Sequence, residues 1–284
     1  WIMQYMGLFS FYLSCKTTTG PFGLSLDYEI DSLNRPESIT AGTKTFAYEY
    51  NGDGTIKKLT YPNGITTDYS YDNARRLIKI ENKHGSTILS SFSYEYDKNG
   101  NITSVTDEVS STTTSYEYDN INRLVRTIRP DASQINYSYD SRGNRIEMNG
   151  STITHEDFKP GSFTYNEWGE AESYTTPEGA TTSYEYDAEG LRTKKTTPDG
   201  ATRYYCDNAG RVIAEADGSN QVTAEIIWGN KPLARKVGSN YYYYLYNGHG
   251  DVIALTDESG NIVNSYDYDE WGNVTSETEQ ISNP

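Results

Sequence analysis

A short motif, Tyr-x-Tyr-Asp, recurs along this chain and constrains its fold more than any other feature. Two or three residues after the Asp comes a Gly or Asn, followed by a polar and an aliphatic residue. Neighbouring copies are mostly about 20 to 26 residues apart, and a fixed period of this size indicates a repeat architecture. The clear copies begin at Tyr69, Tyr94, Tyr116, Tyr137, Tyr184 and Tyr266. Weaker copies centre on Ile30-Asp31, Tyr50-Asn51, Tyr165-Asn166, Cys206-Asp207 and Tyr246-Asn247.

Each unit predicts a β-hairpin. Tyr116 and Tyr118 stand two residues apart, so on a strand both face the same way, and we expect such pairs to pack against neighbouring hairpins. The Asp can accept hydrogen bonds from backbone N–H groups two residues further on and so start a turn. The following Gly supplies the positive φ of a tight loop. A second strand comes next, and turns such as Pro62-Asn63-Gly64 end the unit.

The chain is therefore predicted to be all-β, a series of about ten antiparallel hairpins with negligible helix. The abundance of Thr and Tyr favours strands. Ordinary β-sandwich domains are the alternative, and the single recurring motif disfavours them. Because adjacent strands twist, a long sheet of this kind curves. We expect an open, curved sheet without a plug at either end, whose edge strands tend to pair with other chains.

Charge and composition exclude several classes of function. The net charge is −16, and binding to a nucleic-acid backbone or an anionic membrane surface needs clustered Lys and Arg. The charge therefore argues against both kinds of partner. The apolar stretch from Trp1 to Leu13 is shorter than the roughly 20 residues of a membrane span and has no basic start typical of a secretory signal. We interpret it as a divergent first strand. Cys15 and Cys206 are too few for a disulfide framework or metal cluster, so free thiols are expected.

These residues resemble the RHS/YD-repeat family. Its pattern, close to Tyr-x-Tyr-Asp-x-x-Gly-Arg-Leu, matches residues 116–124 with Asn122 in place of the Gly, and the resemblance extends roughly from Asp27 to Val274. It implies a spiralling sheet that is part of a hollow shell. In bacterial toxins such a shell holds a cytotoxic C-terminal domain, and in wall-associated and animal cell-surface relatives it supports recognition modules. The implied location is secreted or at the cell surface.

The C-terminal stretch is similar to the start of the RHS-associated core, through Gly248-His249-Gly250-Asp251 and through residues 266–273. In the family this module precedes a self-cleaving segment with Asp-Pro pairs. No Asp-Pro pair occurs in this sequence, so the resemblance does not imply autoproteolysis. We divide the chain into a divergent N-terminal strand region (1–26), YD-repeat hairpins (27–240) and a truncated core-like module (241–284), and we interpret it as a fragment.

No catalytic, cofactor-binding or metal-binding residue is predicted. His155-Glu156 lacks the second His of a zinc-protease helix, His84 has no motif around it, and His249 is expected to hydrogen-bond within a tight turn. Most Asp residues occupy turn positions, and calcium-loop spacings do not occur. The run Tyr241–Tyr244 is predicted to send alternate rings to opposite faces of a sheet, although aromatic rows can also stack on sugars.

The sequence thus predicts a non-catalytic structural segment of a secreted or cell-surface protein. It would form part of a shell that encapsulates or presents a C-terminal toxin domain, and its expected partner is the chain's own missing core and toxin segment. The alternative is a binding module of a wall-associated protein that recognises cell-surface carbohydrate or another protein. Nucleic-acid partners, a membrane span and a cofactor are not expected.

Overall fold

The computed structural model describes residues 16–19, 22–152 and 161–283, and within them the chain forms 26 strands and no helix. The stretch Trp1–Leu13, Cys15 and His155 lie outside the described residues. The all-β prediction is confirmed. The 26 described strands exceed the twenty or so that about ten hairpins would supply.

The strands form two sheets, and in each sheet every strand pairs antiparallel with its neighbours in the sequence. The first sheet has fourteen strands: β1 (Lys16–Thr19), β2 (Ser25–Ile30), β3 (Pro36–Ala41), β4 (Lys44–Tyr50), β5 (Ile56–Thr60), β6 (Ile65–Tyr71), β7 (Leu77–His84), β8 (Thr87–Tyr96), β9 (Ile102–Asp107), β10 (Thr112–Tyr118), β11 (Leu124–Ile128), β12 (Gln134–Tyr139), β13 (Arg145–Met148) and β14 (Ser151–Thr152). The second has twelve: β15 (Ser162–Tyr165), β16 (Ala171–Thr175), β17 (Thr181–Tyr186), β18 (Arg192–Thr197), β19 (Gly200–Cys206), β20 (Val212–Asp217), β21 (Val222–Trp228), β22 (Pro232–Val237), β23 (Asn240–Tyr246), β24 (Val252–Thr256), β25 (Ile262–Tyr268) and β26 (Val274–Glu279).

The motif's Asp builds the turn as predicted. Asp72 is representative: its Oδ1 accepts hydrogen bonds from the backbone N–H groups of Ala74 and Arg76, and its Oδ2 accepts one from the Arg76 guanidinium. These bonds hold the pKa of the Asp72 carboxyl below its usual value. The residue before the Arg position has positive φ, which is +64° at Asn122, where the family pattern has Gly.

In six of the described copies, the second tyrosine of the motif ties its strand to the preceding one. The strand pairing shifts by one residue between Glu117 and Tyr118, and the Tyr118 hydroxyl donates to the carbonyl of Ile102, 2.8 Å away at the start of the preceding strand. The same bond recurs from Tyr50, Tyr96, Tyr139, Tyr246 and Tyr268. Each of these copies of the motif therefore satisfies a phenol and a backbone carbonyl together.

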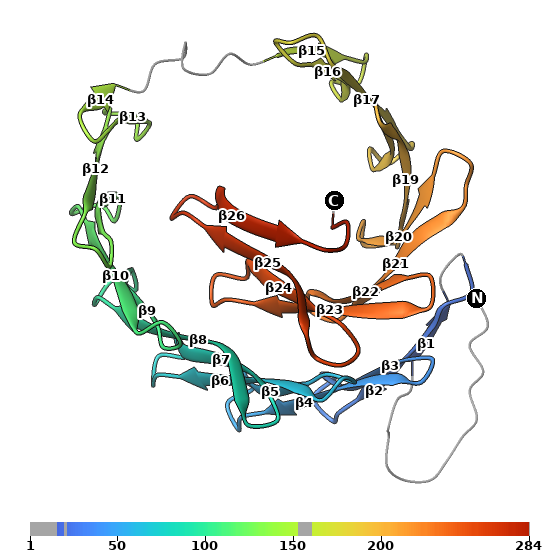
Figure 1. Cartoon of the computed structure of the whole chain (residues 1–284), viewed down its shortest axis with the longest axis horizontal. Coiled ribbons are helices and arrows are strands. Elements are labelled where there is room, and N and C mark those ends of the chain that lie inside the picture. The colour runs from blue at the N-terminus through green and yellow to red at the C-terminus, as the bar shows by residue number, and fades with distance from the viewer. Residues whose placement is uncertain (1–15, 20–21, 153–160, 284) are drawn as a thin grey trace.

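The sheet curves into an open spiral (Figure 1). The first sheet forms an outer wall, and strands β21 to β26, with the residues up to 283, turn inward and lie against its concave side. We call residues 222–283 the inner layer. The spiral shape is confirmed, and the chain's own inner layer occupies part of the space inside the curve.

The main hydrophobic core joins the outer wall to the inner layer. Phe46 from β4 lies against Tyr243 from β23, with ring centroids 5.9 Å apart, and both side chains are fully buried. Ile39 and Leu59 from the wall, and Ile227 from the inner layer, belong to the same cluster. A wall of one-sheet thickness exposes both faces, so burial of one face under a second layer supplies much of the core.

Candidate functional site

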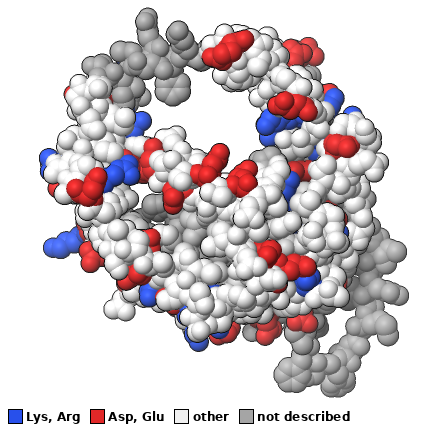
Figure 2. Space-filling model, viewed as in Figure 1, with Lys and Arg blue, Asp and Glu red and all other residues white. Residues whose placement is uncertain are grey.

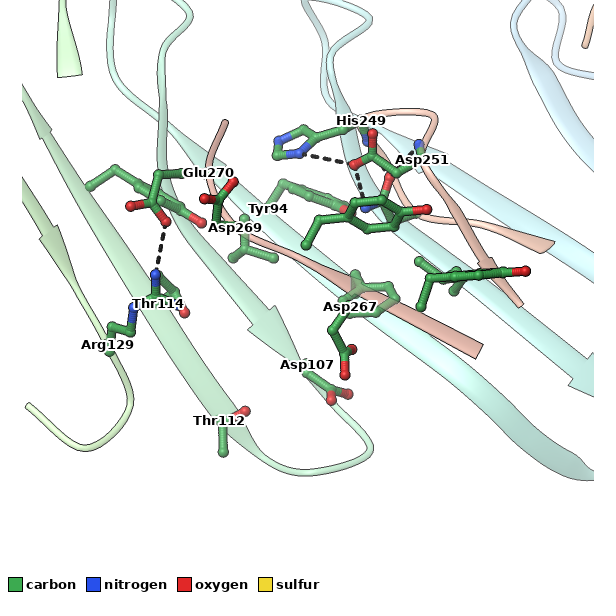
Figure 3. Close-up of a pocket in the computed structure, with 17 residues that line it drawn as sticks. Tyr94, Asp107, Thr112, Thr114, Arg129, His249, Asp251, Asp267, Asp269 and Glu270 are labelled. Carbon is green, nitrogen blue, oxygen red and sulfur yellow. Dashed lines mark hydrogen bonds and ion pairs between the residues drawn. The ribbon is translucent and has the colours of Figure 1, made fainter. Parts of the chain in front are cut away.

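A cleft separates the outer wall from the far end of the inner layer (Figure 3). Its volume is about 200 Å³. The wall contributes residues from β8 to β10 and Arg129, and the inner layer contributes the turn at 247–251, strand β25 and the turn that follows it. The labelled side chains include the aromatic ring of Tyr94, the hydroxyls of Thr112 and Thr114, and a group of carboxylates: Asp107, Asp251, Asp267, Asp269 and Glu270.

One end of the cleft is closed by the turn that carries His249. The Asn247 side chain accepts hydrogen bonds from the backbone N–H groups of residues 249, 250 and 251. The N–H of Gly248 donates to the Tyr94 hydroxyl at 2.7 Å. The His249 ring lies 6.1 Å from the Tyr94 ring and 3.8 Å from the Asp251 carboxylate. His249 therefore lies in a tight turn, as predicted, and that turn docks on a wall tyrosine.

The other end is closed by the turn after β25. The Glu270 carboxylate receives a hydrogen bond from Tyr137 and an ion pair from Arg129 at 3.1 Å, both from the wall. Trp271 meets the Tyr137 ring edge-on with centroids 5.3 Å apart, and the Arg145 guanidinium lies 4.1 Å from the Trp271 ring centre. A buried carboxylate with a cation and a phenol as partners forms a specific contact between the two layers.

The electrostatics between these ends are dominated by negative charge. Among the residues that the structure describes, five carboxylates and one guanidinium, that of Arg129, line the cleft. Burial, and secondly the nearby Glu270 charge, raise the pKa of Tyr116 to about 12, so its phenol stays neutral. Asp107 and Asp267 reach into the space from opposite layers (Figure 3). This excess of carboxylates makes the cleft unfavourable for anions.

The described residues contain no group of three or more His, Cys, Asp or Glu side chains placed to hold a metal ion. His84 lies against Gly64 and Gly260 and does not line the cleft. Cys206 is a free thiol in β19, also outside the cleft. Among the residues described, no helix is long and apolar enough to cross a membrane. The contacts at the two ends of the cleft join the wall to the inner layer.

The tyrosine run divides between two faces, as predicted. Tyr243 packs into the core shared with the wall, whereas Tyr244 belongs to a second cluster with Leu255 and Tyr266 on the opposite face of the inner layer. Sequence reasoning missed Arg129, Glu270 and Trp271 as contact residues. Glu270 and Trp271 directly follow the turn Asp of a repeat, where their side chains resemble ordinary turn substituents.

A known protein family and several solved structures match most of this chain. The family model of the teneurin YD-shell matches residues 63–282. The chain belongs to this YD-shell family. The crystal structure of TcdB2-TccC3-TEV superposes with a TM-score of 0.74 at 16% identity, and the match covers 93% of this chain and 18% of that one. The structure of the Photorhabdus luminescens Tc holotoxin pore gives a TM-score of 0.71 at 16% identity, with 93% of this chain and 17% of that chain covered.

Two curated relatives are more similar in sequence. The tRNA3(Ser)-specific nuclease WapA of Bacillus spizizenii is 31% identical and the tRNA nuclease WapA of Bacillus subtilis is 30% identical. Each match covers 87% of this YD-shell chain but only 12% of the relative. The chain is thus a structural, shell-like segment, and it corresponds to about an eighth of these larger proteins.

Proposed function

We propose that this chain is a non-catalytic part of the wall of a secreted or cell-surface shell, and that the shell encloses or presents a C-terminal toxin domain. The observation that carries the proposal is the inward turn of the spiral. Strands β25 and β26 and the residues that follow them lie within the curve of the wall (Figure 1). Any polypeptide joined to this end starts from inside the hollow.

The last described residues are fixed to the inner layer by side chains. The Asn264 side chain accepts hydrogen bonds from the N–H groups of Gln280 and Ile281 and donates one to the carbonyl of Ile281. Asn283 bonds to the hydroxyls of Tyr244 and Tyr266. Asn264 is buried and thus acts as a substitute strand partner. These contacts keep the chain on the hollow side after β26 ends.

The relatives support a link to toxins. Two of them are named as nucleases, and one of the superposed structures is a holotoxin pore. The matched segment is a small share of each, so the activity of the whole proteins is carried to this chain only as a proposal. The division into an N-terminal strand region, YD hairpins and a core-like module is likewise part of the proposal. The alternative, a carbohydrate- or protein-binding surface, stays a prediction.

Protease protection tests the proposal. A flexible tail with one protease site is joined after Pro284, and the same tail is joined before Trp1 in a second protein. We expect the C-terminal tail to be cut at least about fivefold more slowly than the N-terminal one, because the wall restricts access to the hollow. The free tail peptide gives the unprotected rate. Equal cleavage of both tails in correctly folded protein contradicts the proposal.

A further inference from the structure

The inner layer covers the wall in a regular way. Three wall tyrosines, each the first of its motif, are almost fully buried: Tyr48 is 6%, Tyr94 is 5% and Tyr137 is 4% exposed. Each lies under a turn of the inner layer. Gly229 is packed against Tyr48, Gly248 against Tyr94 and Trp271 against Tyr137. The concave tyrosines of the wall therefore serve as seats for polypeptide turns.

Two ion pairs join the wall to the inner layer, and their charges are arranged in the same way. Lys44 of the wall pairs with Glu258 of the inner layer at 2.5 Å, and Arg129 of the wall pairs with Glu270. Both carboxylates come directly after the Asp of an inner-layer turn. In both ion pairs the wall supplies the cation and the covering segment supplies the anion.

The same kind of surface continues, uncovered, on β15 to β19. Strand pairing places three rings on one face: Phe163 lies opposite Tyr174, Tyr174 lies opposite Thr182, and Tyr184 follows Thr182 by two residues. Tyr204 joins them, because the Arg192 guanidinium lies over both the Tyr184 and the Tyr204 rings, 5.7 and 5.0 Å from their centres. We call Phe163, Tyr174, Tyr184 and Tyr204, with Arg192 and Lys195, the open stripe.

The open stripe faces the hollow. Tyr204 of β19 lies opposite Glu215 of β20 in the strand pairing, so both side chains are on one face. The Glu215 carboxylate accepts a hydrogen bond from Arg235 of β22, which is therefore on that face as well. That face is opposite to the one carrying Ile227 and Tyr243, which pack against the wall. Because the sheet curls inward, the face of Tyr204 is the concave one. Basic side chains lie at the inner edge of this part of the wall (Figure 2).

The open stripe has exposed rings and two basic side chains without an ion-pair partner among the described residues. Phe163 is 47% exposed, and Tyr165, which stacks beside it, is 61% exposed. Neither Arg192 nor Lys195 forms an ion pair with a carboxylate of the described residues. Lys195 is on the same face because it pairs with Tyr184.

Two carboxylates beside Tyr204, those of Glu215 and Asp207, already have cationic partners. Glu215 is bound to Arg235 at 2.8 Å, and Asp207 is bound to Arg211 at 2.6 Å. They therefore do not neutralise Arg192 and Lys195, which leaves two cations on an aromatic surface. Such a surface suits carboxylate-bearing polypeptide.

We propose that the open stripe docks an acidic stretch of the polypeptide that the shell encloses. The inference rests on the proposed function and deepens it by naming the chemistry of the enclosed segment. The docked stretch offers carboxylates to Arg192 and Lys195 and lays glycine or an apolar side chain on the rings. The docked stretch would thus repeat, on β15 to β19, the kind of contact that the inner layer forms on β4 to β12.

Peptide binding tests the proposal on the whole chain. Two labelled peptides of equal length are compared by fluorescence anisotropy at low salt, both of Gly, Ser and one Tyr, one with four Glu and the other with four Lys. We expect the Glu peptide to bind, and the R192Q/K195Q variant to bind it about fivefold or more weakly, since exposed ion pairs contribute modestly. The F163S/Y165S variant, altered only at exposed rings, is expected to weaken binding as well.

The matched control is K194Q/R203Q. It removes the same two charges from the same part of the sheet, but from the opposite face, because Lys194 and Arg203 pair with each other and alternate with the stripe residues. It should bind the Glu peptide within about twofold of the wild type, since only long-range charge is lost. Circular dichroism must show that each variant keeps the fold.

A photo-crosslinker in the Glu peptide should label β17 to β19. Stronger binding of the Lys peptide, or equal loss in both double-charge variants, overturns the inference. The two proposals fail separately. A protected C-terminal tail with no preference for the Glu peptide leaves the shell standing and refutes docking at the stripe. Peptide binding with an unprotected tail does the reverse.

Discussion

Replacement of Gly248 by alanine tests whether the two layers interlock as described. Gly248 and Gly52 occupy the same position in two turns of the same sequence pattern, Asn-Gly-x-Gly. A Cβ at Gly52 would meet nothing within 4 Å. A Cβ at Gly248 would lie 2.5 Å from Cζ and 2.7 Å from the hydroxyl oxygen of Tyr94. Neither glycine has positive φ, so Gly52→Ala is a control for the local backbone.

The magnitude follows from these contacts. Ordinary contacts of a Cβ begin at 3.4 Å, so the turn or Tyr94 has to move by almost 1 Å. Overpacking of this kind costs about 1–3 kcal/mol. The hydrogen bond from the Gly248 N–H to Tyr94 is weakened by the same movement, at a cost of about 1 kcal/mol. Gly52→Ala is expected to be neutral or to stabilise by up to about 1 kcal/mol through the unfolded chain. The gain through the unfolded chain applies to both glycines and cancels, so the difference between the two variants is about 2–4 kcal/mol.

Urea unfolding followed by tryptophan fluorescence gives both values, and hydrogen exchange locates the effect. Amides of β23 and β24 should exchange faster in the Gly248→Ala variant, while those of β15 to β18 stay unchanged. A double-mutant cycle with Tyr94→Ala supplies the decisive check, because removal of the ring should abolish most of the cost of the added methyl group. A difference below about 0.5 kcal/mol between the Gly248 and Gly52 variants would refute the interlocking of turn and tyrosine.

Three further outcomes are expected. Tyr118→Phe removes the hydroxyl that bonds to the preceding strand and should lower the free energy of unfolding by about 1 kcal/mol in the urea assay. Tyr186 occupies the same motif position but has no such bond among the described residues. Tyr186→Phe should therefore cost less than half as much in the same assay. Because burial raises the pKa of Tyr116 from 10.0 to about 12, the neutral phenol contributes stability that is complete below pH 10 and lost as the pH rises toward 12. Phenolate absorbance and circular dichroism should therefore change together in that range, and ionisation of all tyrosines at pH 10 with the fold intact would contradict this. Glu270→Gln breaks the ion pair with Arg129 and should speed hydrogen exchange in β25 and β26 while the core of β4 and β23 keeps its protection.

Much of the local structure could be predicted from the sequence. The turn Asp, the Gly or Asn that follows, and the paired tyrosines act within one hairpin, so their roles depend on few neighbours. Asp72 and Asn122 show this, since both adopt the hydrogen bonding and φ that the repeat alone predicts. The spiral also follows from the repeat, because strands that pair only with sequence neighbours and twist alike have to curve.

The layering could not be predicted in the same way. Tyr94 and Tyr184 begin the same motif with the same Glu and Tyr after them, yet only Tyr94 is covered by the inner layer. That difference depends on which distant turn reaches each tyrosine. One feature of the sequence does indicate the inner layer. Residues 224–228 and 241–246 have apolar or aromatic side chains at most successive positions, which is typical of strands that are buried on both faces. It indicates an inner position but not the partner surface.

The tyrosines explain how one repeat can be both an open wall and a covered one. A leucine at the position of Tyr184 would leave bare apolar surface toward the hollow, whereas a phenol presents a ring and a polar end that water can solvate. At Tyr94 the same polar end receives the N–H of an incoming turn instead of water. The polar group thus has a partner in either state, and coverage changes only the identity of that partner. For this reason the same motif is compatible with the covered wall at Tyr94 and with the uncovered one at Tyr184.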